Sequence, residues 1–135
     1  MLMPPISRYM TRQPWTIERG ANLTAAHELM RSHTVRHLPV MDGGKLVGIV
    51  SERDLHLMET LPDANPDEVS VDEAMTDVVY VAAPDDDTAD VVERMASHKL
   101  GSVVVMTGSR VEGIFTSIDA LQVLSSVLRR TVDPR

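Results

Sequence analysis

The pattern of hydrophobic and polar positions along the chain occurs twice, and its second copy begins 65 residues after the first. The landmarks that recur are Met10-Thr11 as Met75-Thr76, Gly48-Ile49 as Gly113-Ile114, and Asp54 as Asp119. No gap is needed to align the two copies. Self-similarity at a fixed period is the signature of a repeated structural unit, so we expect the chain to be a tandem duplication.

Each copy begins with a strand pattern followed by a helix pattern. Short extended stretches at 14–17 and 78–81 are predicted as first strands. A helix is predicted after each of them. Asn22 and Asp87 are placed to cap these helices, because their side-chain oxygens can accept hydrogen bonds from the first turn.

Two more strands and a closing helix complete each copy. In the first copy the strands are predicted at 38–41 and 46–50, joined by Asp42-Gly43-Gly44, whose glycines can adopt the positive φ of a tight hairpin. Thr107-Gly108-Ser109 is the matching turn. The closing helices are predicted at 52–61 and 117–129. The order is β-α-β-β-α, twice, and the fold class is α/β (α+β).

The copies define a first repeat at 1–61, a linker at 62–70 and a second repeat at 71–135. Two prolines, Pro62 and Pro66, mark the linker. A sheet of three short strands with two helices has difficulty covering both of its faces. We therefore expect the repeats to pack pseudo-twofold through their sheets, with equivalent clefts between them.

A short segment leads into each copy. Ser70 and Glu73 have the spacing of a capping box, so a short helical lead-in to the second repeat is predicted at 71–75. Residues 6–10 correspond to it in the first repeat.

Composition narrows the function classes. The chain has 135 residues, no cysteine and a formal net charge of −7. This charge argues against a nucleic-acid binder, because phosphates would approach against the field of the whole protein. No apolar run approaches the roughly 20 residues of a membrane span, and the N-terminus lacks the pattern of a signal peptide. We expect a cytoplasmic protein with no membrane partner.

The segment Gly48-Ile49-Val50-Ser51-Glu52-Arg53-Asp54 returns as Gly113-Ile114-Phe115-Thr116-Ser117-Ile118-Asp119 and joins a strand to a helix. Its hydroxyl and the N–H groups of the helix's first turn could bind an anion such as phosphate. The aspartate could accept hydrogen bonds from ribose hydroxyls, and the glycine would permit close backbone approach. The same spacing is also a capping box, and the two interpretations are compatible.

These residues, together with Met-Thr before each first strand and Leu38-Pro39-Val40, resemble the cystathionine beta-synthase (CBS) domain. The tandem resembles a Bateman module. The resemblance implies binding of AMP, ADP, ATP, S-adenosylmethionine or a related adenosyl compound, and regulation of an effector protein. It implies no enzymatic activity and no required cofactor.

By this resemblance, Asp54 and Asp119 would hold ribose hydroxyls, and Ser51 and Thr116 would lie near the phosphate or ribose. Backbone at Thr16-Ile17 and Tyr80-Val81 would flank the adenine. The full set of predicted nucleotide-binding residues is Thr16, Ile17, Arg36, His37, Pro39, Ser51, Arg53, Asp54, Tyr80, Val81, Ser102, Val103, Thr116, Ser117 and Asp119.

The duplication is imperfect where charge matters. Arg36-His37 becomes Gly101-Ser102, and Arg53 becomes Ile118. Because arginine offers a planar fork for phosphate oxygens, we expect a stronger site in the first repeat and a weaker or vacant one in the second.

Other constellations are weaker. His33 and His37 lack a third metal ligand, and Ser51 with Asp54 lacks the base of a hydrolase, so no metal site or catalytic residue is predicted. An apolar stripe on the last helix favours a homodimer. The regulated effector would be another chain. The alternative is a structural or oligomerisation module with degenerate, non-binding clefts.

Overall fold

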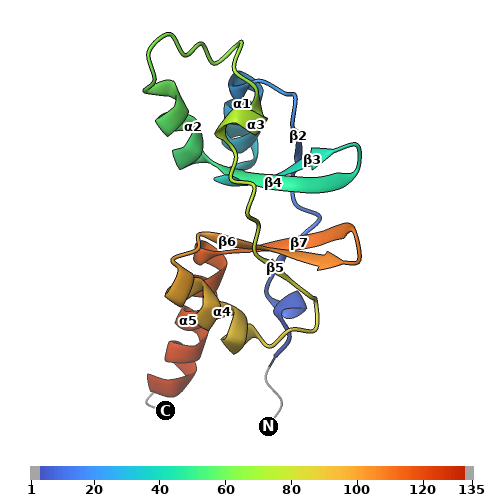
Figure 1. The fold of residues 1–135 in the computed structure, drawn as a ribbon. Helices are drawn as coiled ribbons and strands as arrows, with labels where there is room; N and C mark the ends of the chain where they lie inside the picture. Colours follow the sequence, from blue (N-terminus) through green and yellow to red (C-terminus); the bar gives the residue numbers. More distant parts are fainter. Residues whose placement is uncertain (1–3, 133–135) are drawn as a thin grey trace. The chain divides into compact units, whose positions relative to one another are not determined.

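The computed structural model describes residues 4–132 and divides into two compact units (Figure 1). The first-repeat unit comprises residues 14–79, and the second-repeat unit comprises residues 4–13 and 80–132. Each unit contains one β-sheet and the helices that pack on it, which confirms the predicted α/β fold. The pseudo-twofold packing of the two sheets stays a prediction.

The sheet of the first-repeat unit has three strands in the order β2-β3-β4. These are β2 (Ile17–Glu18), β3 (His37–Asp42) and β4 (Lys45–Ser51). Strand β2 runs parallel to β3, and β3 runs antiparallel to β4. The turn between β3 and β4 has positive φ at Gly43 and Gly44, as predicted for this hairpin.

Three helices belong to this unit: α1 (Leu23–His33), α2 (Glu52–Glu59) and α3 (Val71–Ala74). The predicted cap of α1 is confirmed, because the Ala25 N–H donates to Asn22 Oδ1 at 2.8 Å. Helix α2 ends two residues before the predicted Leu61. Its C-terminal turn closes at Thr60, whose hydroxyl donates to the Leu57 carbonyl at 2.7 Å, shortly before Pro62.

The sheet of the second-repeat unit has four strands in the order β1-β7-β6-β5. These are β1 (Thr11–Arg12), β5 (Val81–Ala82), β6 (Ser102–Thr107) and β7 (Arg110–Thr116). The unit also contains a 3-10 turn η1 (Ile6–Arg8) and the helices α4 (Thr88–His98) and α5 (Ser117–Val132). Asp87 caps α4 as predicted, since it accepts from the Ala89 N–H at 2.7 Å.

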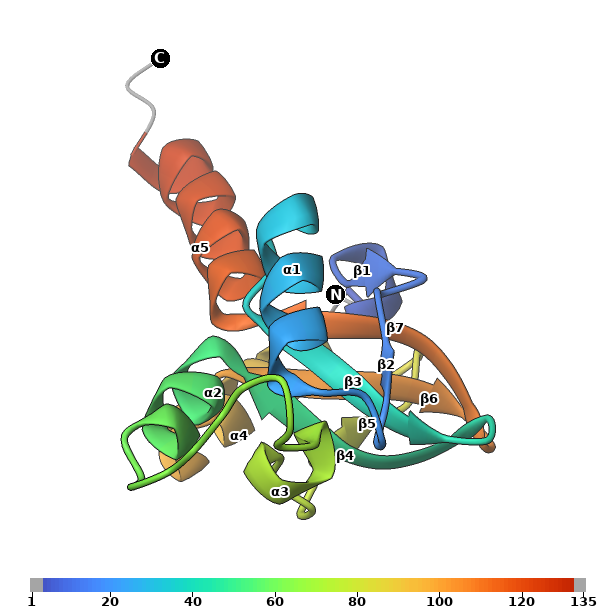
Figure 2. The same cartoon turned by 90° about the horizontal axis from the view of Figure 1, so that it is seen from above.

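Helix α5 extends three residues beyond the predicted end at Arg129 and is twice as long as its counterpart α2. Figure 2 shows it running away from β7. Every residue from 124 to 131 is exposed, so the second half of α5 makes little contact with the rest of its unit.

The lead-in segments pack with the opposite sequence repeat. Ile6 and Met10, which precede the first repeat, are buried in the second-repeat unit with Phe115. Val71, which precedes the second repeat, is buried in the first-repeat unit with Leu55. The compact units therefore do not coincide with the repeats at 1–61 and 71–135, because each core is completed by a segment from the other repeat.

Gly48 and Gly113 are the points where these crossing segments pass. A methyl group on Gly48 would lie 2.5 Å from Met75 Sδ and 2.9 Å from the Thr76 carbonyl oxygen. A methyl group on Gly113 would likewise lie 2.6 Å from Met10 Sδ. The close backbone approach that these glycines permit is thus made by the Met-Thr segment.

The two first strands were placed too early. Only Ile17–Glu18 and Val81–Ala82 pair with their neighbours, instead of 14–17 and 78–81. Pro14 lacks an N–H for a ladder bond, and Val78 is 67% exposed.

Strand β1 was not predicted, because its pairing with β7 joins segments about a hundred residues apart.

Candidate functional site

The junction between β4 and α2 is a complete capping box in the first-repeat unit. The Asp54 N–H donates to Ser51 Oγ at 3.0 Å, and the Ser51 N–H donates to Asp54 Oδ2 at 2.9 Å. Both groups would otherwise be unpaired donors near the start of the helix. The capping interpretation of this motif is confirmed.

The junction between β7 and α5 repeats this arrangement. The Thr116 N–H donates to Asp119 Oδ2 at 2.9 Å, and the Asp119 N–H donates to Thr116 Oγ1 at 3.3 Å. Two hydroxyls add to this carboxylate: Thr116 Oγ1 lies 3.2 Å and Thr11 Oγ1 lies 3.5 Å from Asp119 Oδ2. Asp119 is therefore held more firmly than Asp54.

Both capping boxes use one carboxylate oxygen. All the hydrogen bonds to Asp54 and Asp119 fall on Oδ2, and within residues 4–132 no donor reaches Oδ1 of either side chain. Both residues are half-buried, so Oδ1 can accept a hydrogen bond from outside the protein. The cap orients the carboxylate and leaves one of its oxygens for a ligand hydroxyl.

The helix N-termini offer fewer N–H donors than expected. The Glu52 N–H donates to the Arg36 carbonyl at 2.9 Å, and the Ser117 N–H donates to the Gly101 carbonyl at 3.0 Å. Together with the capping bonds, these contacts use two of the first three N–H groups of each helix. An anion at this end would depend mainly on side chains.

The junction in the first-repeat unit has a histidine and two arginines near it along the chain. His37 lies opposite Ser51 in the β3-β4 ladder, and Arg36 precedes it. Burial lowers the pKa of His37, Asp54 acts in the opposite direction, and Arg36 lowers it further. This combination places His37 among Asp54 and Arg36. Arg36 and Arg53 are exposed and make no ion pair within the described part of the chain.

The second-repeat unit has no arginine in these positions. Ser102 lies opposite Thr116 in the β6-β7 ladder, Gly101 precedes it, and Ile118 follows Ser117. Ser117 is exposed, whereas the predicted site residue Val103 is 1% exposed and belongs to the core.

The strands position the residues predicted to flank the adenine. Ile17 pairs with Val40, so Thr16 falls level with Pro39 if the parallel register continues by one residue. Ile17 and Pro39 are buried, and Thr16 is exposed. Thr16 therefore directly precedes β2, while Pro39 and His37 lie on β3 and Ser51 of the capping box ends β4 of the same sheet.

The counterparts of Thr16 and Ile17 are Val81 and Ala82, one residue later than predicted. Val81 pairs with Val104 and Ala82 with Val105, which keeps the 65-residue spacing. The Tyr80 carbonyl accepts from the Val104 N–H at 3.0 Å, so it is already used. The predicted stretches 14–17 and 78–81 lie 64 residues apart, one residue short of the repeat period.

An aromatic side chain lies against the histidine that ends the helix in each unit, stacked in the first-repeat unit and tilted in the second. The rings of Trp15 and His33 lie 3.6 Å apart and nearly parallel, and those of Tyr80 and His98 lie 5.3 Å apart. Trp15 adjoins Thr16 and is 51% exposed. The sequence analysis missed these pairs, although both partners recur at the 65-residue spacing.

The sequence matches the CBS domain family twice, at residues 6–57 and 71–126. The chain belongs to the CBS-domain family. A CBS-domain pair is a regulatory module, and the two matches account for both units of the structure.

Solved CBS-domain proteins share this fold. A Vibrio cholerae protein whose name assigns it to acetoin utilization (AcuB) is 30% identical, with 99% of each chain covered and a TM-score of 0.85. The CBS-domain pair of protein MJ0100, in complex with 5′-methylthioadenosine and S-adenosyl-L-methionine, is 25% identical. That comparison covers 93% of this chain and 99% of MJ0100's, with a TM-score of 0.85.

The first two curated relatives are much longer than this chain. An A-adding tRNA nucleotidyltransferase of Geobacter sulfurreducens is 28% identical over 88% of this chain, which spans 13% of the enzyme's length. A second relative is protein MJ1225 of Methanocaldococcus jannaschii, and this chain spans 43% of its length. Among residues 4–132, no helix is long and apolar enough to cross a membrane.

Proposed function

We propose that the CBS pair binds an adenosine nucleotide or adenosyl compound at its strand-helix junctions and regulates an effector protein on another chain. One observation carries this proposal: both capping boxes orient an aspartate and leave its Oδ1 for a ligand hydroxyl. Vicinal ribose hydroxyls would donate to that oxygen. The adenosyl ligands named for the MJ0100 pair support this ligand class.

The first-repeat unit provides the stronger site in this proposal. Arg36 and Arg53 are exposed cations, Arg36 next to His37 and Arg53 next to Asp54 in the sequence, and they would attract phosphate oxygens. His37 lies at the same end of the sheet. In the second-repeat unit, Thr116 and Asp119 would hold a ribose without this electrostatic support, which favours weak binding there.

The remaining predictions follow from a binding role. The module would act through ligand-dependent affinity for its effector, without catalysis and without a required cofactor. AMP, ADP and ATP would make it an energy sensor, and S-adenosylmethionine would make it a sensor of an adenosyl compound. We propose a cytoplasmic location, with neither membrane nor nucleic acid as partner, in line with the net charge of −7. We also propose that the chain forms a homodimer.

The second candidate function is a structural module whose junctions bind nothing. It is favoured by the hydrogen bonds that complete each capping box within the chain, and by the engaged Glu52 and Ser117 N–H groups. Such a module would assemble with its partner in the same way whether or not nucleotide is present.

A thermal-shift series with AMP, ADP, ATP, S-adenosylmethionine and 5′-methylthioadenosine separates the two functions. A ligand present at 100 times its Kd stabilises the native state by about 2.7 kcal/mol. We expect at least one compound to raise Tm, and Asp54→Asn to reduce the rise, because asparagine retains a cap acceptor and loses the charge. No shift with any of the five compounds would favour the structural module.

A further inference from the structure

A hollow of about 380 Å³ lies between α1 and α2 of the first-repeat unit, and we call it the α1-α2 hollow. Residues 27 and 31 lie one turn apart on α1, and residues 52 and 56 lie one turn apart on α2, so each helix contributes one polar face. The hollow gathers four basic side chains and one acidic side chain. These ionisable residues are His27, Arg31, Arg36, Glu52 and His56.

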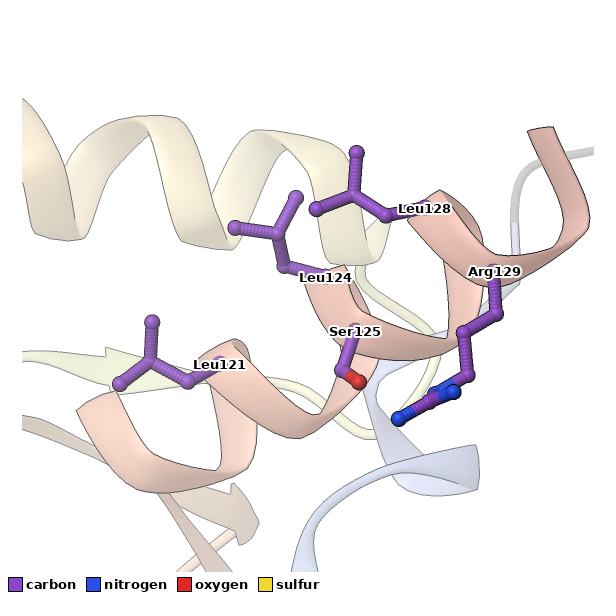
Figure 3. Close-up of a pocket in the computed structure, with 5 residues that line it drawn as sticks. All are labelled: Leu121, Leu124, Ser125, Leu128 and Arg129. Atoms are coloured by element: carbon purple, nitrogen blue, oxygen red, sulfur yellow. The ribbon is translucent and has the colours of Figure 1, made fainter. Parts of the chain in front are cut away.

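The second-repeat unit shows that the fold does not require these side chains. At the 65-residue spacing the five positions are taken by residues without charge, namely Val92, Ala96, Gly101, Ser117 and Leu121. Figure 3 shows Leu121 on α5 together with Leu124, which takes the position of Glu59. Met30, which also lines the hollow, is buried like its counterpart Met95. The same helix pair thus packs without any of these charges, so their concentration in one hollow points to a ligand.

The two arginines of the hollow are free to bind an anion. Within residues 4–132 neither Arg31 nor Arg36 makes an ion pair, although the chain has 20 acidic residues against 13 basic ones. Arg19 of the same unit, in contrast, binds both Asp42 and Asp72. Because each guanidinium is a planar fork that matches phosphate oxygens, two unpaired forks on one hollow fit two linked phosphate groups.

The histidines of the hollow add donors on its other side. His27 Nε2 lies 2.5 Å from Glu59 Oε2, and the rings of His27 and His56 lie 5.6 Å apart. Glu59 is thus engaged by His27 and does not compensate the arginines. His56 is exposed, so its ring nitrogens can reach a ligand in the hollow.

We propose that the α1-α2 hollow binds a diphosphate group, with Arg31 and Arg36 on its two phosphates and His56 as a further donor. Glu52 opposes this ligand and limits its affinity, because its carboxylate lines the same hollow. The lining includes neither Ser51 nor Asp54, so this site is distinct from the capping box. The inference goes beyond the proposed adenosyl function and does not depend on it.

Pyrophosphate is the probe for this site, used in buffer without divalent cations. We expect it to raise the Tm of the wild type by mass action, and calorimetry gives its Kd. Arg31→Ala installs the residue that α4 carries at the equivalent position, Ala96, so the variant should fold. It should weaken pyrophosphate binding about 10-fold through the loss of a charged hydrogen bond. The matched control is Arg94→Ala, which removes an exposed arginine of α4 and should leave the Kd unchanged.

Glu52→Gln should change the affinity in the opposite direction. It removes the carboxylate that lines the hollow and retains the capping box, which is made by Ser51 and Asp54. We expect pyrophosphate to bind this variant several-fold more tightly. The proposal is overturned by the absence of a Tm rise in the wild type, by equal weakening in Arg31→Ala and Arg94→Ala, or by unchanged binding in Glu52→Gln.

Two further titrations separate the hollow from the adenosyl site. Asp54→Asn should leave the Kd for pyrophosphate unchanged, and its loss in this variant would overturn the proposal. Arg31→Ala should keep the thermal shift with 5′-methylthioadenosine, which carries no phosphate. The absence of that shift in the wild type counts against the adenosyl site alone.

ADP identifies the source of the diphosphate. Equal affinities for ADP and pyrophosphate would support a free diphosphate as the ligand. Tighter binding of ADP, with the gain lost in Asp54→Asn, would support the diphosphate of a nucleotide whose ribose is held at the capping box. In either case Arg31→Ala should weaken the binding, and a Kd for ADP and pyrophosphate that does not respond to this substitution would contradict the assignment of the hollow.

Discussion

The two units have the same backbone at the strand-helix junction and differ in the charges around it. In the first-repeat unit His37 lies opposite Ser51 and feels the charges of Asp54 and Arg36, and Arg53 is an exposed neighbour of Asp54 in the sequence. In the second-repeat unit Gly101, Ser102 and Ile118 take the places of Arg36, His37 and Arg53, and the cap is strengthened by hydroxyls. Both units thus share the capping box that orients the aspartate, and only the first-repeat unit carries arginines at these positions.

We expect the largest effect on stability at Gly48 and Gly113, where both units have the same close packing. Gly48→Ala and Gly113→Ala should each destabilise the protein by about 2 to 3 kcal/mol, because the methyl group would clash with a crossing segment whose carbonyl cannot move freely. Urea unfolding measures the loss, and Gly20→Ala, with open space around it, is the control. A loss below about 0.5 kcal/mol at either glycine would show that the crossing segments are not held tightly.

Removing one arginine should change ligand affinity without changing stability. Arg53→Ala should weaken ATP binding about 10-fold, since a charged hydrogen bond contributes about 1.5 kcal/mol or more. Its matched counterpart, Ile118→Arg, should strengthen the second-repeat site. Isothermal titration calorimetry measures both. An unchanged Kd in Arg53→Ala would show that the difference in charge between the units does not matter for binding.

The contributions of the two capping boxes to stability can be compared by unfolding measurements that need no ligand. Asp54→Ala should destabilise the protein by about 1 kcal/mol through loss of its capping box, and Asp119→Ala should cost more because Thr11 and Thr116 also donate to Asp119. Equilibrium unfolding in urea checks the order. The reverse order would mean that the extra hydroxyl contacts do not stabilise the second-repeat unit.

The smallest expected effect is on the pH dependence of stability, and it arises only in the first-repeat unit. Burial lowers the pKa of His37 in the folded protein, so the unfolded chain takes up a proton first as pH falls below about 6.5. Stability contributed by neutral His37 is complete above that pH and decreases below it. His37→Asn should therefore flatten the fall in Tm between pH 7.5 and 5.5. An unchanged slope would exclude His37 as its source.

Local features could be predicted from the sequence, and long-range ones could not. The caps at Asn22 and Asp87 and the Gly43-Gly44 turn depend on neighbouring residues, and all were predicted. The crossing of Met10 and Met75 onto the opposite glycines depends on tertiary packing, which the repeat pattern does not encode. At the site, the doubled Ser/Thr-x-x-Asp motif was readable, whereas the loss of the Glu52 and Ser117 N–H donors required the structure.

We propose that the CBS pair has two unlike adenosyl sites, with the stronger one in the first-repeat unit. Calorimetric titration of ATP into the wild type and into Arg53→Ala tests it most directly. We expect two classes of site, or one occupied site per chain, and a weakening of the tighter site in the variant. Two equal and independent sites that are unaffected by Arg53→Ala would contradict the account.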